Sequence, residues 1–203
     1  MRFGLLGPAN GDLAGLARCA EFLLNTARVT RAIYLGDDDA LEDTVALWAE
    51  SLVGRNPSDE GIWERALPVV ATGSPDQLDT WVRGERARLR LKSLERLPPE
   101  QLRTIEMFGD RVAVLIHDKA FLDEEDIFSA TFLIYGRSTG PLVKRIGTRW
   151  FLTPGPIGSN RGGCAVLDDP GDEVVVTIYD GGGHAFVSET LAVRRSSKLN
   201  VRQ

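Results

Sequence analysis

The chain has 203 residues, a formal net charge of −5, and hydrophobic and charged fractions of 43% and 26%. This length predicts one domain with a sizeable core, and the two fractions are ordinary for a globular protein. The acidic balance excludes general nucleic-acid binding, and no apolar run in the sequence is long enough to span a membrane.

The first half of the chain alternates apolar strands with amphipathic helices. Strands are predicted over 2–7, 31–36 and 67–73, and helices over 12–27, 41–54 and 77–96. Asp12 is placed to cap the first helix, and an acidic cluster, Asp37 to Asp39, follows the second strand. Alternation of this kind predicts parallel pairing of the strands.

The second half is rich in hairpins, with turns predicted at Gly109-Asp110 and at the DGGG stretch, 180–183. DGGG lacks the Lys-Ser/Thr ending of a phosphate-binding loop and opens no helix, so a hairpin turn is the interpretation. A short helix is predicted over 122–130. Two strands joined at Gly109-Asp110 are predicted over 102–118, and the remaining strands over 131–136, 142–147, 148–155, 164–169, 173–180 and 184–195.

These elements predict an α/β fold of the α+β sandwich type. Two mixed β-sheets pack face to face in it, and helices lie on the outside. One domain covers 1–195, and 196–203 is a flexible tail. Cys19 and Cys164 lie far apart in apolar sequence, which predicts buried free thiols and a cytoplasmic protein.

Polar and glycine-containing motifs follow the predicted strands. They read PANG, GDD, GSPD, VLIHD and GRSTGP, and their notable residues are Pro8, Asn10, Asp37, Ser74, Asp76, His117, Arg137 and Thr139. In order and spacing, these motifs resemble those of the calcineurin-like metallophosphoesterases. The resemblance is closest to the small bacterial phosphodiesterases and to the phosphoesterase-fold subunit of the retromer coat, and it covers nearly the whole chain.

The resemblance implies a site for two divalent metals, such as manganese, that has lost most of its ligands. Pro8 stands for an aspartate and Asn10 for a histidine, while Arg137 and Thr139 replace the two histidines of Gly-His-Thr-His. Proline has no side-chain donor atom, and arginine stays protonated. The remaining candidate metal ligands are Asp37, Asp76 and His117.

No cofactor is therefore expected. Arg137 is predicted to pair with Asp37 or Asp76 where a metal would otherwise sit. Two structural interpretations stay open: Asp37 as the cap of the following helix, and His117 as a structural histidine.

The leading hypothesis is a pseudoenzyme that serves as a binding or scaffold module for a partner protein, for which the retromer subunit is a precedent by resemblance. No phosphoesterase activity, nucleic-acid partner or membrane span is expected. Trp48, Trp63, Trp81 and Trp150 are either interface or core residues.

Two alternatives remain. One is a divergent metal-dependent phosphodiesterase or phosphatase with a depleted site. The other is a metal-free sensor that holds phosphate or a nucleotide with Arg137, Ser138 and Thr139.

Overall fold

The computed structural model describes residues 1–159, 161–171 and 173–192. The tail predicted over 196–203 lies outside the described residues, as does the end of the last predicted strand. The helices are α1 (Leu13–Glu21), α2 (Ala40–Val53), α3 (Ile62–Thr72), α4 (Pro75–Arg90) and α5 (Glu124–Ser129). The strands are β1 (Arg2–Leu6), β2 (Arg31–Tyr34), β3 (Leu94–Arg96), β4 (Arg103–Phe108), β5 (Arg111–Ile116), β6 (Phe132–Tyr135), β7 (Leu142–Ile146), β8 (Arg149–Thr153), β9 (Cys164–Asp168), β10 (Glu173–Tyr179) and β11 (Ala185–Ala192).

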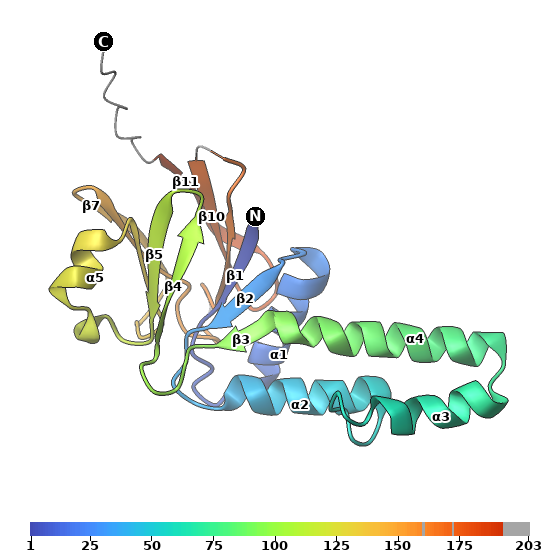
Figure 1. Cartoon of the computed structure of the whole chain (residues 1–203). Helices are drawn as coiled ribbons and strands as arrows, with labels where there is room; N and C mark the ends of the chain where they lie inside the picture. The colour runs from blue at the N-terminus through green and yellow to red at the C-terminus, as the bar shows by residue number, and fades with distance from the viewer. Residues whose placement is uncertain (160, 172, 193–203) are drawn as a thin grey trace, which may run out of the picture.

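The strands form two mixed sheets, as predicted (Figure 1). The larger sheet has the order β11-β10-β9-β1-β2-β3, and its β1, β2 and β3 are parallel. The smaller sheet has the order β4-β5-β6-β8-β7. The hairpins at Gly109-Asp110 and at 180–183 join antiparallel pairs, so both predicted turns are confirmed.

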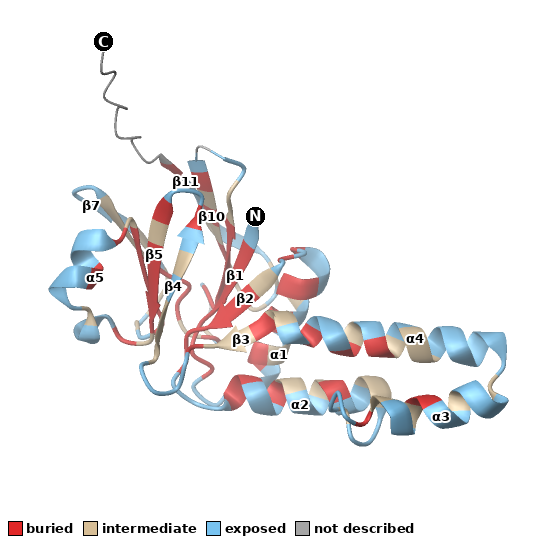
Figure 2. Cartoon of the chain, in the orientation of Figure 1, coloured by how far each residue is buried: buried red, intermediate tan, exposed pale blue. Residues whose placement is uncertain are grey.

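The core lies between the two sheets because inward residues alternate along each strand. Phe3 of β1 meets Phe108 of β4 with ring centroids 5.5 Å apart, and Phe108 meets Phe132 of β6 at 6.0 Å. Figure 2 shows that burial concentrates in the strands. The predicted sandwich with helices outside is confirmed, since α1 covers the outer face of the larger sheet and α5 packs near that of the smaller sheet.

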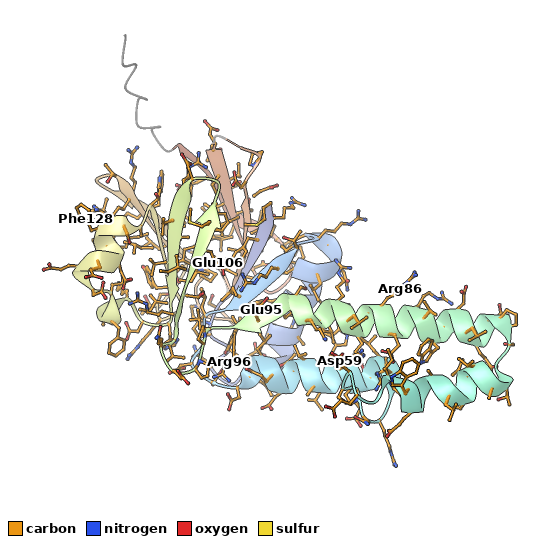
Figure 3. The ribbon with its side chains drawn as sticks, viewed as in Figure 1. Asp59, Arg86, Glu95, Arg96, Glu106 and Phe128 are labelled. Atoms are coloured by element: carbon orange, nitrogen blue, oxygen red, sulfur yellow. The ribbon has the colours of Figure 1, made fainter. Side chains whose placement is uncertain are left out.

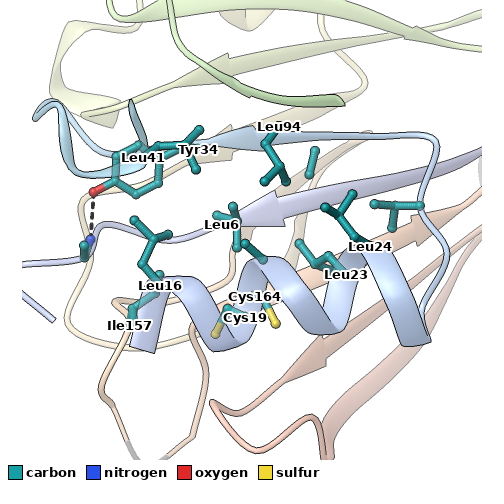
Figure 4. Packing of buried hydrophobic residues seen from close by; sticks show 14 of the residues in the cluster. Leu6, Leu16, Cys19, Leu23, Leu24, Tyr34, Leu41, Leu94, Ile157 and Cys164 are labelled. Atoms are coloured by element: carbon teal, nitrogen blue, oxygen red, sulfur yellow. Dashed lines mark hydrogen bonds between the residues drawn. The ribbon is translucent and has the colours of Figure 1, made fainter. Parts of the chain in front are cut away.

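Both cysteines are buried free thiols, as predicted, and they lie in the cluster beneath α1 (Figure 4). Asp12 caps α1 by accepting the backbone N–H of Gly15 at 2.8 Å. A π-helical turn, Phe22–Thr26, extends α1 to nearly the predicted end of the first helix.

The helices α2, α3 and α4 project from the sandwich as an arm (Figure 1). The strand predicted over 67–73 is wrong, because those residues belong mainly to α3. Locally, Pro68 disfavours a helix interior and two valines favour a strand. Contacts with α4 outweigh that preference, since Ala66 is buried and Arg65 pairs with Glu85 of α4.

The helix predicted over 77–96 begins at Pro75 and ends at Arg90, and the strand β3 that follows was not predicted. A strand of three residues, one apolar and two charged, carries no clear alternation. It becomes a strand because it pairs in parallel with Ala32 to Tyr34 of β2.

Trp63 is 80% exposed, as expected for a tryptophan in an interface. Trp48, Trp81 and Trp150 are half-buried. Among the described residues, no helix combines the length and the apolar character needed to cross a membrane.

Candidate functional site

The ends of strands from both sheets meet at one edge of the sandwich. Nδ1 of His117, which follows β5, lies 2.8 Å from the carbonyl oxygen of Leu35, which follows β2. The backbone N–H groups of Gly136 and Arg137, which follow β6, both donate to the carbonyl oxygen of His117. Asp37, His117 and Arg137 are thus brought to the same edge, as the order of the motifs predicted.

This meeting of strand ends depends on a glycine. A Cβ atom on Gly136 would lie 2.1 Å from the carbonyl oxygen of Leu35, which is far inside van der Waals contact. The glycine of the GRSTGP motif therefore has a structural reason to be there, because it lets the two sheets approach closely at the site.

His117 is oriented toward Asp37. A carbonyl oxygen only accepts hydrogen bonds, so Nδ1 of His117 carries a hydrogen and donates the hydrogen bond to the carbonyl oxygen of Leu35. Nε2 then faces the carboxylate of Asp37, with 3.5 Å between Nε2 and Oδ2. With Nδ1–H donated to the backbone, Nε2 of the neutral ring is an acceptor that can bind a metal ion, and it can donate to the carboxylate only when the imidazole is protonated.

Asp38 turns to a different partner, the buried Tyr34. The Tyr34 hydroxyl donates to Oδ1 of Asp38 at 2.6 Å and accepts the backbone N–H of Ala9 at 2.9 Å (Figure 4). Burial, followed by the hydrogen bond to Asp38, raises the pKa of Tyr34 well above its usual value. Tyr34 therefore stays protonated and ties the loop after β1 to the loop after β2. Sequence reasoning missed it, because a tyrosine in an apolar strand looks like any other core residue.

Asp39 turns to Arg96, at the end of β3. Arg96 hydrogen-bonds to Asp39 and, through Nη1, to Oε1 of Glu42 at 2.9 Å (Figure 3 labels Arg96). Arg96 was missed because β3 was missed. The three consecutive aspartates thus contact three different groups, and they do not converge on one point.

The predicted pairing of Arg137 with Asp37 or Asp76 is wrong, because Arg137 pairs with Asp118. Its Nη1 lies 2.8 Å from Oδ2 of Asp118. The reason is the contact between β5 and β6, where the backbone N–H of Arg137 binds the carbonyl of His117 and so places Arg137 beside the next residue. A backbone N–H donated by Ala120, followed by Arg137, holds the pKa of Asp118 below its usual value.

Ser74 and Asp76 do not lie with the other motif residues. They belong to the start of α4, at the tip of the arm, far from the strand ends (Figure 1). Ser74 is the N-cap and accepts the backbone N–H of Gln77, whose side chain completes a capping box. The prediction that Ser74 and Asp76 belong to the site is therefore wrong. The strand predicted over 67–73, which would have ended at the site, is helical.

The remaining predicted residues make other contacts. The carbonyl of Pro8 accepts the N–H of Ile157 at 2.9 Å, and Asn10 is exposed in a turn with a φ of 50°. The Ser138 hydroxyl lies 3.0 Å from both the carbonyl oxygen of Gly140 and Oγ1 of Thr153. Thr139 is exposed. An anion site on Arg137, Ser138 and Thr139 stays a prediction.

The donor set does not fit a centre of two metal ions. Asp37 and His117 supply two donors, whereas each ion needs several. Within the described ranges, no group of three or more His, Cys, Asp or Glu side chains is placed to hold a metal ion.

Replacing Arg137 by alanine is expected to lower the free energy of unfolding by less than about 1 kcal/mol, because solvent screens the exposed guanidinium and Asp118, which is 12% exposed, keeps its hydrogen bond from Ala120. The Arg137 side chain is 73% exposed. Asp118→Ala should lower the free energy of unfolding by more, about 1–2 kcal/mol, because it also removes the carboxylate that accepts the backbone N–H of Ala120. Urea unfolding at pH 7 measures both, and an Arg137→Ala loss as large as that of Asp118→Ala would contradict this account of the site.

No protein-family model matches the chain, and no curated protein matches it. Solved structures are similar over most of its length. A predicted phosphoesterase from Streptococcus pneumoniae has a TM-score of 0.48 at 13% identity, covering 94% of this chain and 98% of its own. An archaeal phosphodiesterase has a TM-score of 0.47 at 11% identity, covering 94% and 100%. Vps29 from Chaetomium thermophilum has a TM-score of 0.48 at 12% identity, covering 96% and 100%. At these values the likenesses carry no argument about activity.

Proposed function

We propose that this chain is a catalytically inactive protein of metallophosphoesterase-like fold that acts as a binding module for a partner protein. The observation that carries the proposal is that most carboxylates at the strand ends are bound to other side chains. Asp38 binds Tyr34, Asp39 binds Arg96 and Asp118 binds Arg137, which leaves Asp37 and His117 as the two facing groups that could hold a metal ion.

These pairs leave little for a phosphate ester or its metals. A two-metal mechanism needs carboxylates and imidazoles that converge on both ions. Arg137 stands in the motif where the resemblance implies histidine ligands, and a guanidinium has no lone pair with which to bind a metal ion. Loss of the site leaves the fold available as a surface for binding.

Exposed aromatic side chains support the binding role. Phe121 and Phe128 are 76% and 85% exposed, on the turn before α5 and on α5 itself. Phe128 projects on the side of the molecule away from the arm (Figure 3). Ile127, beside Phe128 on α5, is 39% exposed as well, and exposed apolar groups gathered on one element are typical of contact surfaces. Affinity capture from the native host tests this role, with Phe128→Ser as the variant that should retain less of the partner.

Purified protein is expected to hold no stoichiometric manganese, iron or zinc, and to show no manganese-dependent hydrolysis of bis-p-nitrophenyl phosphate. The reason is the shortage of donors around Asp37 and His117. Elemental analysis and a colorimetric assay measure the two properties. Manganese-dependent turnover that Asp37→Ala abolishes, and that Asp76→Ala at the arm tip does not, would establish the alternative of a divergent phosphoesterase.

A further inference from the structure

The outer side of α4 carries exposed arginines in a row. Arg83, Arg86 and Arg90 follow one another at intervals of three and four residues, so their side chains recur on one side of the helix. These three residues are called the arginine row. The row covers about 10 Å along the helix axis, because each residue adds about 1.5 Å. It therefore forms one continuous basic surface.

The arginine row faces away from the contacts that hold α4 in the arm. Glu85 and Arg88 are buried, and a Cβ atom on Gly84 would lie 3.1 Å from the carbonyl oxygen of Leu52 in α2. Successive residues turn by about 100° around a helix, so the row lies roughly opposite these packed residues. Figure 3 shows the labelled Arg86 projecting from the side of α4 that is turned away from α2 and α3. The row is thus open to a partner.

The arginine row keeps its positive charge. Within the described part of the chain, neither its three members nor the exposed Arg28 form an ion pair. Arg83 donates to the carbonyl oxygen of Asp79 at 3.3 Å and to the Thr80 hydroxyl at 3.5 Å, and both acceptors are neutral. The Asp79 carboxylate belongs to the same side of α4, nearer to the arm tip than the row.

At its sandwich end, the row meets the turn that follows α1. Arg90 donates to the carbonyl oxygen of Leu24, which holds the end of α4 against this turn, and Arg28 lies in the turn. In Figure 1, the turn and the larger sheet rise above α4 at this end, so the row runs along the inside of the corner between arm and sandwich. A single peptide segment can enter this corner, whereas a flat membrane would meet the sandwich first.

We propose that the arginine row binds an acidic helical segment of the partner protein. This inference rests on the proposed function, because it names the chemistry of a partner for the binding module. Carboxylates at intervals of three and four residues on a helix repeat the spacing of the row, so a helix lying along α4 can meet each guanidinium in turn. Leu89 is 45% exposed and comes directly before Arg90, so an apolar residue of the segment can pack beside the charges.

The distribution of charge favours a short acidic segment over a nucleic acid. The chain has a net charge of −5, and the exposed Asp76 and Asp79 follow the row toward the arm tip. A long polyanion that extended beyond the row would meet these carboxylates and be repelled. A segment that covers only about 10 Å of α4 needs no contact beyond the row itself.

Fluorescence anisotropy of a labelled peptide tests the inference, using the full chain. The peptide is alanine-rich and about twelve residues long, with glutamates at intervals of three and four residues, so that as a helix it spans about 18 Å. Wild-type protein is expected to bind it at low salt. Added salt should weaken the binding, because it screens exposed charges. The same peptide with glutamine in place of glutamate should not bind.

Charge reversal locates the contact. Arg86→Glu should weaken binding about threefold to tenfold, and Arg83→Glu combined with Arg86→Glu at least about tenfold, because repulsion replaces attraction. Arg55→Glu is the matched control, since it changes the net charge equally and Arg55 is exposed in the loop between α2 and α3. Far-UV circular dichroism checks that the variants are folded.

A wild-type protein that does not bind the peptide at low salt, or an equal loss in the Arg86 and Arg55 variants, would overturn the proposal. Phosphatidylserine vesicles and a single-stranded DNA oligonucleotide are tested in parallel. If either bound more tightly than the peptide and lost that binding in Arg86→Glu, the choice of an acidic protein segment would be wrong. The proposed function can fail separately, because metal content, phosphodiesterase activity and the Phe128→Ser capture experiment do not involve the row.

Discussion

Replacing Glu85 by glutamine is expected to lower the free energy of unfolding by about 3 kcal/mol or more, because it removes the carboxylate from a buried ion-pair network. Nε of Arg65 lies 2.7 Å from Oε1 of Glu85, and Nε of Arg88 lies 2.8 Å from Oε2. The three side chains are only 8%, 6% and 5% exposed, in the order Arg65, Glu85 and Arg88. Without the carboxylate, two buried guanidinium groups lose their shared partner.

The loss should depend on pH. Hydrogen bonding to Arg65, and then to Arg88, holds the pKa of Glu85 below its usual value. A carboxylate with a lowered pKa in the folded state stabilises the fold above its unfolded pKa, about 4.3, and loses that effect as the pH falls through the folded pKa. The difference between wild type and Glu85→Gln should therefore be full near pH 7 and shrink in acid.

Urea unfolding measures the difference, and hydrogen exchange over 62–90 locates it in the arm. Glu100→Gln is the matched control, since Glu100 is exposed between the arm and β4. Equal stability of the Glu85 and Glu100 variants at pH 7 would show that the network does not hold the arm.

Replacing Gly136 by alanine is expected to lower the free energy of unfolding by about 3 kcal/mol, at the upper end for overpacking. The added Cβ would lie 2.1 Å from the carbonyl oxygen and 2.9 Å from Cβ of Leu35. Backbone atoms cannot rotate away as a flexible side chain does, so the ends of β2 and β6 would have to separate. That movement would also disturb the contact between His117 and Leu35.

Gly140→Ala is the control for this change, because a Cβ on Gly140 would meet nothing within 4 Å. Thermal and urea unfolding of both variants measure the effect. If Gly136→Ala were as stable as Gly140→Ala, the residues after β2 and β6 could not be in close contact.

The sequence by itself determined the features that depend on neighbours in the chain. Apolar runs and alternation marked most strands, and Asp12 marked the start of α1. Glycine and aspartate marked the hairpin at Gly109-Asp110. The order of the strand-end motifs also predicted that Asp37, His117 and Arg137 would lie together. The signals for strands, cap and hairpin come from residues that are neighbours in the chain. The motif signal comes from short motifs that each follow a strand recognisable from the sequence.

Only the tertiary structure decided which groups meet at the site and what the middle of the chain becomes. The residues around Pro68 are helical because α4 supplies Glu85 and a surface that buries Ala66, and β3 is a strand because β2 supplies its hydrogen bonds. Arg137 pairs with Asp118 because a backbone bond across β5 and β6 fixes its position. These outcomes depend on contacts between segments distant in sequence, and short or ambiguous segments have too little local preference to resist them.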